Sequence, residues 1–183
     1  MIVVGRPLPE PRERKAVMID ATYLKPVGGP HRTASSLAAK KRAKGSLIGR
    51  STGGMNTKLH AVTDANDRPN SFFMTAGQVR DHICAAGLLD ELPKAQSLLA
   101  NRGYDTDWFR DALQEKGITP CIPVRKSRNK AAKYDTSRHN RRNHIEILFV
   151  RLKDWRRVAT RYDRRPNAFF SAIALAATVI FWL

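Results

Sequence analysis

The stretch SLLANRGYDTDWFRDAL, which runs from Ser97 to Leu113, predicts a buried strand, a tight turn and a helix in immediate succession. Leu98–Ala100 is apolar, Asn101 and Gly103 interrupt it, and an amphipathic helical pattern follows. A polar residue where a buried strand ends is a common position for a catalytic side chain, because ligands gather at the carboxyl ends of strands. The residue found there is Asn101, a neutral amide and not a carboxylate.

The patterns on both sides of this stretch predict one α/β domain, with a mixed sheet flanked by helices. The last expected strand, 119–124, is expected at a sheet edge because it contains Pro120 and Pro123. Asp81 is a candidate N-cap for the helix expected at 81–92, and Gly117 is a candidate C-cap for the helix expected at 107–116. Pro166 is expected to separate the helix at 139–162 from the terminal helix. The expected strands are 16–24, 58–62, 71–75, 97–100 and 119–124, and the expected helices are 81–92, 107–116, 139–162 and 169–183.

Two segments do not follow these patterns. Residues 1–15 contain several prolines and are expected to form a flexible leader before one folded domain at 16–183. Residues 27–56 are rich in Gly, Ser, Lys and Arg and are expected to form an inserted basic loop. This loop is either a DNA contact or a solvated insertion.

Charge is the unusual feature of the composition. The chain has 33 Lys and Arg against 16 Asp and Glu, a formal net charge of +17, although 42% of its residues are hydrophobic as in a globular protein. Such an excess indicates a polyanionic partner, most often nucleic acid. The alternatives are a ribosome-associated protein and binding to an anionic membrane surface.

Cysteine usage and hydropathy indicate a cytoplasmic protein. Cys84 and Cys121 are far apart and form no CxxC motif, so they predict neither a disulfide framework nor a zinc site. Residues 1–14 lack the apolar core of a secretory signal. The most hydrophobic stretch, 169–183, is shorter than the roughly 20 residues that span a bilayer. We therefore expect a buried terminal helix and no membrane partner.

Asp20 is the first candidate functional residue, because it lies between Ile19 and Ala21 in an apolar strand. An unpaired carboxylate in such a place is costly, so a metal, a cation or a hydrogen-bond network must compensate it. A strand aspartate, a second group at the end of a later strand and a helix glutamate together suit a divalent metal such as Mg²⁺. With two metals, such a site cleaves phosphodiesters.

The helix predicted from residue 139 supplies that glutamate. His139, Arg142, Glu146 and Lys153 are spaced so that they fall within about 60° on a helical wheel. One carboxylate is thus flanked by cations, either at a functional site or on an exposed, salt-bridged face. The apolar stripe of the same helix is Ile145, Leu148, Leu152, Trp155 and Ala159.

Several blocks of the chain, in order, resemble the bacterial insertion-sequence DDE transposases, most closely the insertion-sequence-five family. The resemblance runs from about Val17 to Leu183. The blocks are MIDATYLK, IGRSTGGMNTKLHAVTDANDRP, FFMTAGQVRD, RGYDTDWFRDALQEKGITPCIP and RRNHIEILFVRLKDWRRVATRYDRRPNAFFSAIALAATVIFWL.

The resemblance implies a ribonuclease-H-like fold and cleavage and strand transfer of double-stranded transposon ends and target DNA, with Mg²⁺ or Mn²⁺. It also implies a homo-oligomer on DNA and a place at the bacterial nucleoid. Its first catalytic aspartate corresponds to Asp20, its catalytic glutamate to Glu146, and the flanking cations to Arg142 and Lys153. The tyrosine that begins this signature corresponds to His139, a departure.

The second catalytic aspartate of the family corresponds to Asn101, so one of the three carboxylates that would bind the metal is missing. We expect reduced metal binding and activity. Asp105 or Asp107 would either replace it or form a turn and a helix N-cap. Transposases of this kind also carry an N-terminal region before the first catalytic strand, and the chain is expected to match the catalytic half alone.

Three functions therefore remain open. The chain is a transposase catalytic domain with reduced or lost activity, a non-catalytic DNA-binding remnant, or a basic protein bound to RNA or ribosomes. Only the last does not require Asp20, Asn101 and Glu146 to converge in space.

Overall fold

The central strand of the fold is β1 (Ala16–Pro26), whose residues Val17–Asp20 are all buried. In the computed structural model, residues 16–27, 47–66, 68–125, 135, 139–140, 142–163 and 165–183 are described. A continuous buried run, in place of an alternating one, is typical of a strand that is covered on both faces. This strand carries Asp20.

The described strands form one mixed sheet in the order β2-β3-β1-β5-β6, in which β4 also pairs with β3 and β7 with β1. The β1–β3 and β3–β4 pairs are antiparallel, whereas β1–β5 and β5–β6 are parallel. The predicted mixed sheet is confirmed, and β6 lies at an edge as expected. The strands are β2 (Gly49–Ser51), β3 (Gly54–Asp64), β4 (Pro69–Ala76), β5 (Ser97–Ala100), β6 (Thr119–Cys121) and β7 (Thr160–Arg161).

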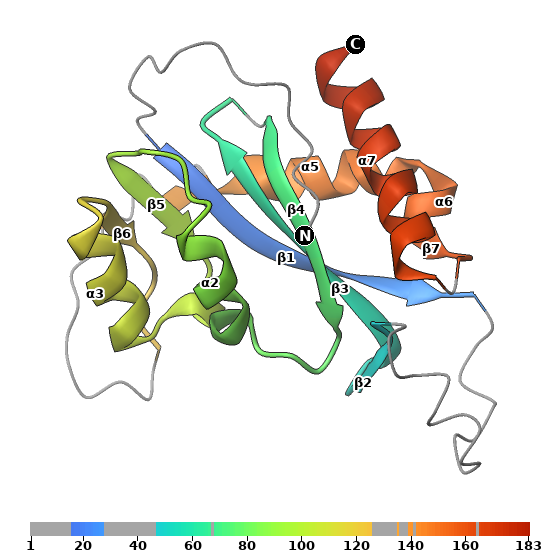
Figure 1. Cartoon of the computed structure of the whole chain (residues 1–183), viewed down its shortest axis with the longest axis horizontal. Helices are drawn as coiled ribbons and strands as arrows, with labels where there is room; N and C mark the ends of the chain where they lie inside the picture. The colour runs from blue at the N-terminus through green and yellow to red at the C-terminus, as the bar shows by residue number, and fades with distance from the viewer. Residues whose placement is uncertain are drawn as a thin grey trace.

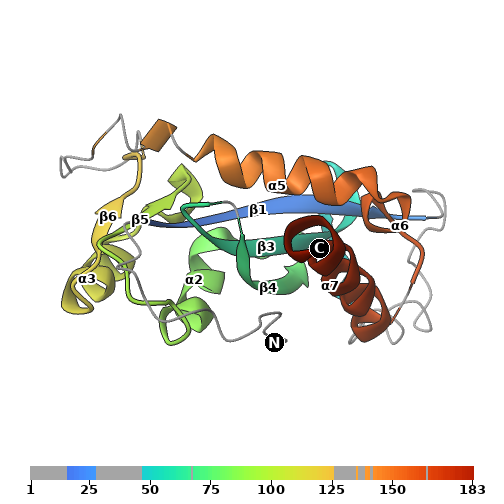
Figure 2. The same cartoon turned by 90° about the horizontal axis from the view of Figure 1, so that it is seen from above.

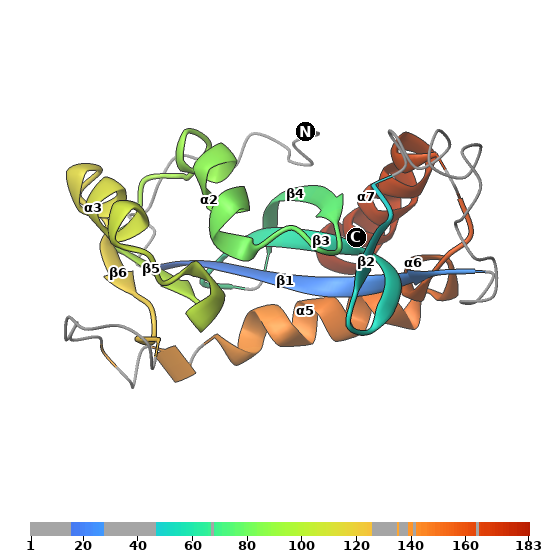
Figure 3. The same cartoon turned by 90° about the horizontal axis from the view of Figure 1, so that it is seen from below.

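Helices cover both faces of this sheet (Figure 1). Figures 2 and 3 show α5 along one side of β1, with α2 and α3 along the other. The terminal helix α7 packs against α5, α6 and β4. The helices are α2 (Asp81–Leu89), the 3₁₀ turn η1 (Arg102–Tyr104), α3 (Asp107–Glu115), α5 (Asn143–Asp154), α6 (Arg156–Ala159) and α7 (Pro166–Trp182).

Two apolar cores result from the alternation of side chains along β1. Met18 faces a core that includes Leu148 of α5 and Phe169 of α7, whereas Val17 and Ile19 face a core built with α2 and α3. Even-numbered residues from Met18 onward therefore face α5. Asp20 is one of them, which directs its side chain toward the helix that carries Glu146.

The register between β1 and β5 places the candidate residues side by side. Their parallel pairing runs from Ala16 opposite Ser97 to Ile19 opposite Ala100, where β5 ends. The next residue of each strand is Asp20 and Asn101. On this side of β1 the pairing resumes only at Lys25 and Pro26, which pair with β7. Within the described residues, the edge of β1 from residue 20 to residue 24 thus lies in a gap between β5 and β7.

The helix predicted to run from residue 139 to residue 162 is wrong at its C-terminal end. The helix α5 ends at Asp154, because Trp155 adopts an extended conformation. The chain then forms α6 and β7, and Thr160–Arg161 pairs with Lys25–Pro26 of β1. Trp155 is consequently exposed and does not continue the apolar stripe.

The basic loop predicted at 27–56 is also corrected at its C-terminal end, where Gly49–Ser51 forms β2 and pairs with β3. Residues 28–46 of this loop and the predicted leader at 1–15 lie outside the described residues. The helix starts differ as well: the N-cap residues of α2 and α3 are Arg80 and Thr106, and neither Asp81 nor Asp107 caps its helix. Gly117 does adopt the expected left-handed conformation after α3.

Among the described helices, none has the length and apolar character to cross a membrane. The hydrophobic terminal segment forms α7, and its residues Phe169, Ile173 and Ala177 lie in the core shared with α5.

The helix α5 offers a matched test of this packing. Ile145 is fully buried, whereas Ile147 on the same helix is 46% exposed. We expect Ile145→Ala to lower the free energy of unfolding by about 2–5 kcal/mol and Ile147→Ala by less than about 1 kcal/mol. Urea denaturation of the two variants measures this difference. Equal losses would contradict the placement of α5 against the sheet.

Candidate active site

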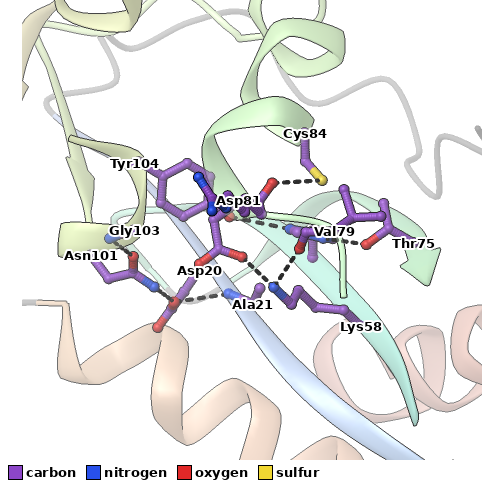
Figure 4. A network of polar contacts seen from close by, with 12 residues as sticks. Asp20, Ala21, Lys58, Thr75, Val79, Asp81, Cys84, Asn101, Gly103 and Tyr104 are labelled. Atoms are coloured by element: carbon purple, nitrogen blue, oxygen red, sulfur yellow. Dashed lines mark hydrogen bonds and ion pairs between the residues drawn. The ribbon is translucent and has the colours of Figure 1, made fainter. Parts of the chain in front are cut away.

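The carboxylate of Asp20 is the centre of a polar cluster at the end of β5, part of which is drawn in Figure 4. Its Oδ1 accepts hydrogen bonds from Asn101 Nδ2 at 2.5 Å and from the Ala21 amide at 2.8 Å. Its Oδ2 accepts from Arg142 Nη1 at 2.5 Å. Asp20 is only 6% exposed, so these three donors replace water around a buried charge.

Burial raises the pKa of Asp20 above its ordinary value. The Ala21 amide, the Arg142 guanidinium and the Asn101 amide each lower it, while the charge of Glu146 raises it. Loss of solvation thus outweighs the three donors. Ionisation of Asp20 is therefore less favourable in the folded state than in the unfolded state, and perturbed carboxyl groups of this kind are common at functional sites.

Both ends of the Asn101 side-chain amide are engaged. Its Nδ2 donates to Asp20, and its Oδ1 accepts from the Gly103 amide at 2.6 Å, which closes a tight turn before Tyr104. A rotation that exchanged the two amide atoms would break both contacts. The orientation is therefore set by its partners, and an N–H group, not an oxygen, faces the carboxylate of Asp20.

Helix α5 and the residue before it supply the remaining charged groups. Arg142 Nη2 donates to Glu146 Oε1 at 2.5 Å, so one guanidinium joins Asp20 and Glu146. Lys153, two turns further along, donates to Thr22 Oγ1 at 2.6 Å, and burial lowers the pKa of its ammonium group. The side chain of Glu146 is half exposed, in contrast to that of Asp20.

The structure therefore brings Asp20, Asn101, Arg142 and Glu146 into one contiguous cluster, with Lys153 beside it on Thr22. Their catalytic roles stay predictions. His139 lies before the start of α5, where its carbonyl accepts from the Arg142 amide at 2.9 Å, and burial lowers the pKa of its ring.

A buried ion pair behind the turn was not found from the sequence. Lys58 donates to Asp81 Oδ1 and to the Val79 carbonyl, both at 2.8 Å (Figure 4). Burial lowers the pKa of Lys58, but the hydrogen bond and charge of Asp81 outweigh it and the pKa is raised. The available signal was Lys58 itself, at the start of the strand expected at 58–62, because a charge that becomes buried there has to be compensated as at Asp20.

This ion pair packs against the backbone of the turn. A Cβ atom added to Gly103 would lie 2.4 Å from Asp81 Oδ2 and 2.7 Å from Asn101 Oδ1. A side chain at position 103 would therefore displace the carboxylate of Asp81 or the amide of Asn101 from its present position.

A second buried group supports the same turn. Tyr104, the last residue of η1, contacts His60 Nδ1 at 3.2 Å through its hydroxyl, and His60 Nε2 contacts Thr75 Oγ1 at 3.0 Å. Burial lowers the pKa of His60 to about 3, so the imidazole is neutral. The ring also stacks on Phe73, with 4.3 Å between centroids.

The two aspartates considered as replacements lie after the turn. Asp105 is buried, where Arg110 Nε donates to its Oδ1 at 2.8 Å and the Arg125 amide to its Oδ2 at 2.7 Å. Asp107 is exposed in the first turn of α3. These contacts favour a structural role for Asp105.

The donors present do not amount to a full three-carboxylate metal site. Asp20 and Glu146 supply two carboxylates, which share the Arg142 guanidinium, and Asn101 directs an N–H group toward them. Within the described parts of the chain, no group of three or more His, Cys, Asp or Glu residues is arranged to hold a metal ion. The cation that balances this cluster in the structure is Arg142.

Comparison with protein families finds a match to the transposase DDE domain over residues 11–182. The chain is 34% identical over 130 residues to the protein assigned as the transposase of insertion sequence element IS6501 from Brucella ovis. That match covers 70% of this chain and 99% of the relative. A match to the protein assigned to IS402 of Burkholderia cepacia is 30% identical over 139 residues, and covers 69% of this chain and 63% of the relative.

Solved structures share the fold. A chain of the simian T-cell lymphotropic virus intasome, in complex with PP2A regulatory subunit B56 gamma, aligns with a TM-score of 0.51 and 13% identity. A chain of the piggyBac transposase synaptic complex with hairpin DNA aligns with a TM-score of 0.52 and 11% identity. The alignments cover 93% and 92% of this chain but 49% and 47% of those chains. The ribonuclease-H-like fold implied by the sequence is confirmed.

The buried carboxylate predicts a pH-dependent stability difference. Because the pKa of Asp20 is raised on folding, protonated Asp20 favours the folded state, and this contribution is lost as pH rises through the folded pKa. We expect Asp20→Asn to be more stable than the natural chain at neutral pH, and the difference to vanish below pH 3.8, the ordinary pKa of the group.

Urea unfolding of both proteins across this pH range measures the difference. Glu146→Gln is the matched control, because Glu146 contacts the same guanidinium from a half-exposed position and should change stability less. A variant at Asp20 that is destabilised at every pH would mean that the bond to Arg142 outweighs burial.

Proposed function

The chain belongs to the transposase DDE domain family, and we propose that it is the catalytic domain of a DNA transposase whose cleavage activity is impaired by Asn101. The proposed reaction is metal-dependent cleavage and strand transfer of insertion-sequence DNA. The observation that carries the proposal is the cluster at the end of β5, in which Asp20 contacts Asn101 directly and is linked to Glu146 through Arg142. A basic protein bound to RNA or ribosomes would not need this convergence.

The roles proposed for individual residues follow from their contacts. Asp20 and Glu146 are the two carboxylates of the site, and Arg142 neutralises both. Lys153 donates to Thr22 on the open edge of β1, which supports a contact of its ammonium group with a phosphate as its proposed role. DDE transposases generally use divalent metal ions, and Mg²⁺ or Mn²⁺ is the cofactor proposed for this chain. Such an ion would supply activation of the attacking oxygen.

The charge at position 101 supports the proposed impairment. A carboxylate there would give the site three negative oxygen donors, whereas the amide gives two carboxylates and an N–H group directed at one of them. Mg²⁺ loses its water shell reluctantly and depends on such charge. Asp20, Asn101 and Glu146 are therefore the proposed metal-binding positions, with Asn101 the weak member.

Double-stranded DNA is the proposed partner, on the basis of the net charge of +17. Action on transposon ends and target DNA as a homo-oligomer follows from family membership and is part of the same proposal.

A second candidate function is DNA binding without cleavage. The fully engaged amide of Asn101 favours it, because Asp20 and Gly103 both depend on that amide in the present arrangement. In that case the chain would occupy transposon ends without cutting them.

Cleavage by Asn101→Asp separates the two candidates. We expect the natural chain to nick a plasmid carrying the DNA that flanks its own reading frame weakly or not at all with Mg²⁺ or Mn²⁺. The variant should be faster by about tenfold or more, because even ligand-supporting residues contribute about 10–100-fold at metal sites. Asn101→Asp combined with Glu146→Gln is the inactive control. Full activity of the natural chain would contradict the proposed impairment.

Metal-dependent stability gives a readout that does not require catalysis. Asn101→Asp should be less stable than the natural chain without metal, because it replaces the donor to Asp20 with a second carboxylate across a 2.5 Å contact. Added Mn²⁺ should raise the Tm of the variant more than that of the natural chain. Equal shifts in the two proteins would argue against a metal site at Asp20 and position 101.

A further inference from the structure

A hollow of about 640 Å³ lies beside the Asn101–Gly103 turn, and Gly103 is part of its lining. It opens between β2, the segment from Gly77 to Asp81, and Gly103. The residues that matter for its chemistry are Tyr23, Arg50, Lys58, Arg80, Asp81 and Arg125. None of these side chains takes part in the cluster around Asp20.

The charges in this hollow are not balanced within the described residues. Lys58 is neutralised by Asp81. Arg125 donates to the carbonyl oxygens of Arg102 and Gly103 at 3.0 and 2.6 Å, which orients its guanidinium, and no described acidic side chain forms an ion pair with it. Arg50 and Arg80 are exposed, and no described acidic side chain pairs with either. A concave surface with several unneutralised cations favours an anionic ligand.

Tyr23, on the open edge of β1, lines the hollow. Tyr23 follows Thr22, the partner of Lys153, and points to the opposite face of the sheet, beside its cross-strand neighbour Lys58. The Tyr23 ring is 49% exposed, and Lys58 Nζ lies 5.1 Å from its centroid. A DNA strand that ran from the Asp20 cluster along residues 20–24 of β1 would therefore contact the ring of Tyr23 and then Arg50 and Arg80.

We propose that this hollow binds one unpaired strand of DNA, with its phosphates at Arg50 and Arg80 and a base against Tyr23. Its volume suits a nucleotide-sized group and is too small for a duplex. Cations that follow a backbone next to an exposed aromatic ring are the usual means of binding single strands. The inference rests on the proposed function, since the strand is the one that reaches the Asp20 cluster.

Salt-dependent binding tests the cations. With a short single-stranded DNA of mixed sequence as the probe, Arg50→Ala combined with Arg80→Ala should weaken binding about tenfold or more at low salt. The slope of log affinity against log salt should fall by about 1.4, because each lost phosphate contact on a single strand removes about 0.7. Arg50→Lys combined with Arg80→Lys should restore the slope.

The control removes the same charge elsewhere. Arg156 and Arg157 are exposed and line a separate hollow with Tyr162, so Arg156→Ala combined with Arg157→Ala should change the slope for the same probe less. Equal losses in the two double variants overturn the proposed subsite. A natural chain that binds neither single-stranded nor duplex DNA in a salt-dependent way overturns the proposed function itself.

Tyr23 tests the single-strand part of the inference. Tyr23→Leu should weaken binding of the single-stranded probe about tenfold and leave binding of a duplex of the same sequence within about twofold, whereas Tyr23→Phe should retain both. Equal weakening of single-stranded and duplex binding by Tyr23→Leu would overturn the assignment to an unpaired strand.

Discussion

The carboxylate of Asp20 lies in the central strand of the sheet with almost no contact to water, and the surrounding structure has to compensate it. Three donors from three places do so: the backbone of β1 itself, the end of β5, and the residue that precedes α5. The Asp20 carboxylate thereby links the end of β5 to the start of α5. Burial still raises the pKa of Asp20, so the carboxylate is retained at a cost in stability.

Residue 101 determines whether the protein or an added cation balances that charge. With an amide, Asn101 donates to Asp20 and accepts from the Gly103 amide, and Arg142 contacts both carboxylates. With a carboxylate, two acidic oxygens would face each other at hydrogen-bond distance, and a bound cation would be the natural way to hold them. Under the proposed function, Asn101 therefore leaves the charge of Asp20 balanced within the protein, whereas an aspartate at position 101 would favour a bound cation.

Elements defined by local periodicity could be predicted, and features that depend on pairing at a distance could not. The β5–turn–α3 unit, the hairpin and the alignment of Arg142, Glu146 and Lys153 follow from spacing along the chain. The strand β2 is only three residues long in a Gly- and Ser-rich segment, so no pattern marks it. The end of α5 is set by pairing of Thr160–Arg161 with β1, and the Lys58–Asp81 pair joins residues far apart in sequence.

The placement of the cations near the site indicates which of them are available to a polyanion. Arg142, Lys58 and Arg110 each contact a carboxylate and hold the local structure, so their charge is already neutralised within the protein. Arg50 and Arg80 lack such partners among the described residues, and both face the hollow beside the open edge of β1. The net charge of +17 alone does not locate a DNA-binding surface. The distinction between neutralised and unneutralised cations supports the hollow lined by Arg50 and Arg80 as the proposed DNA-binding surface.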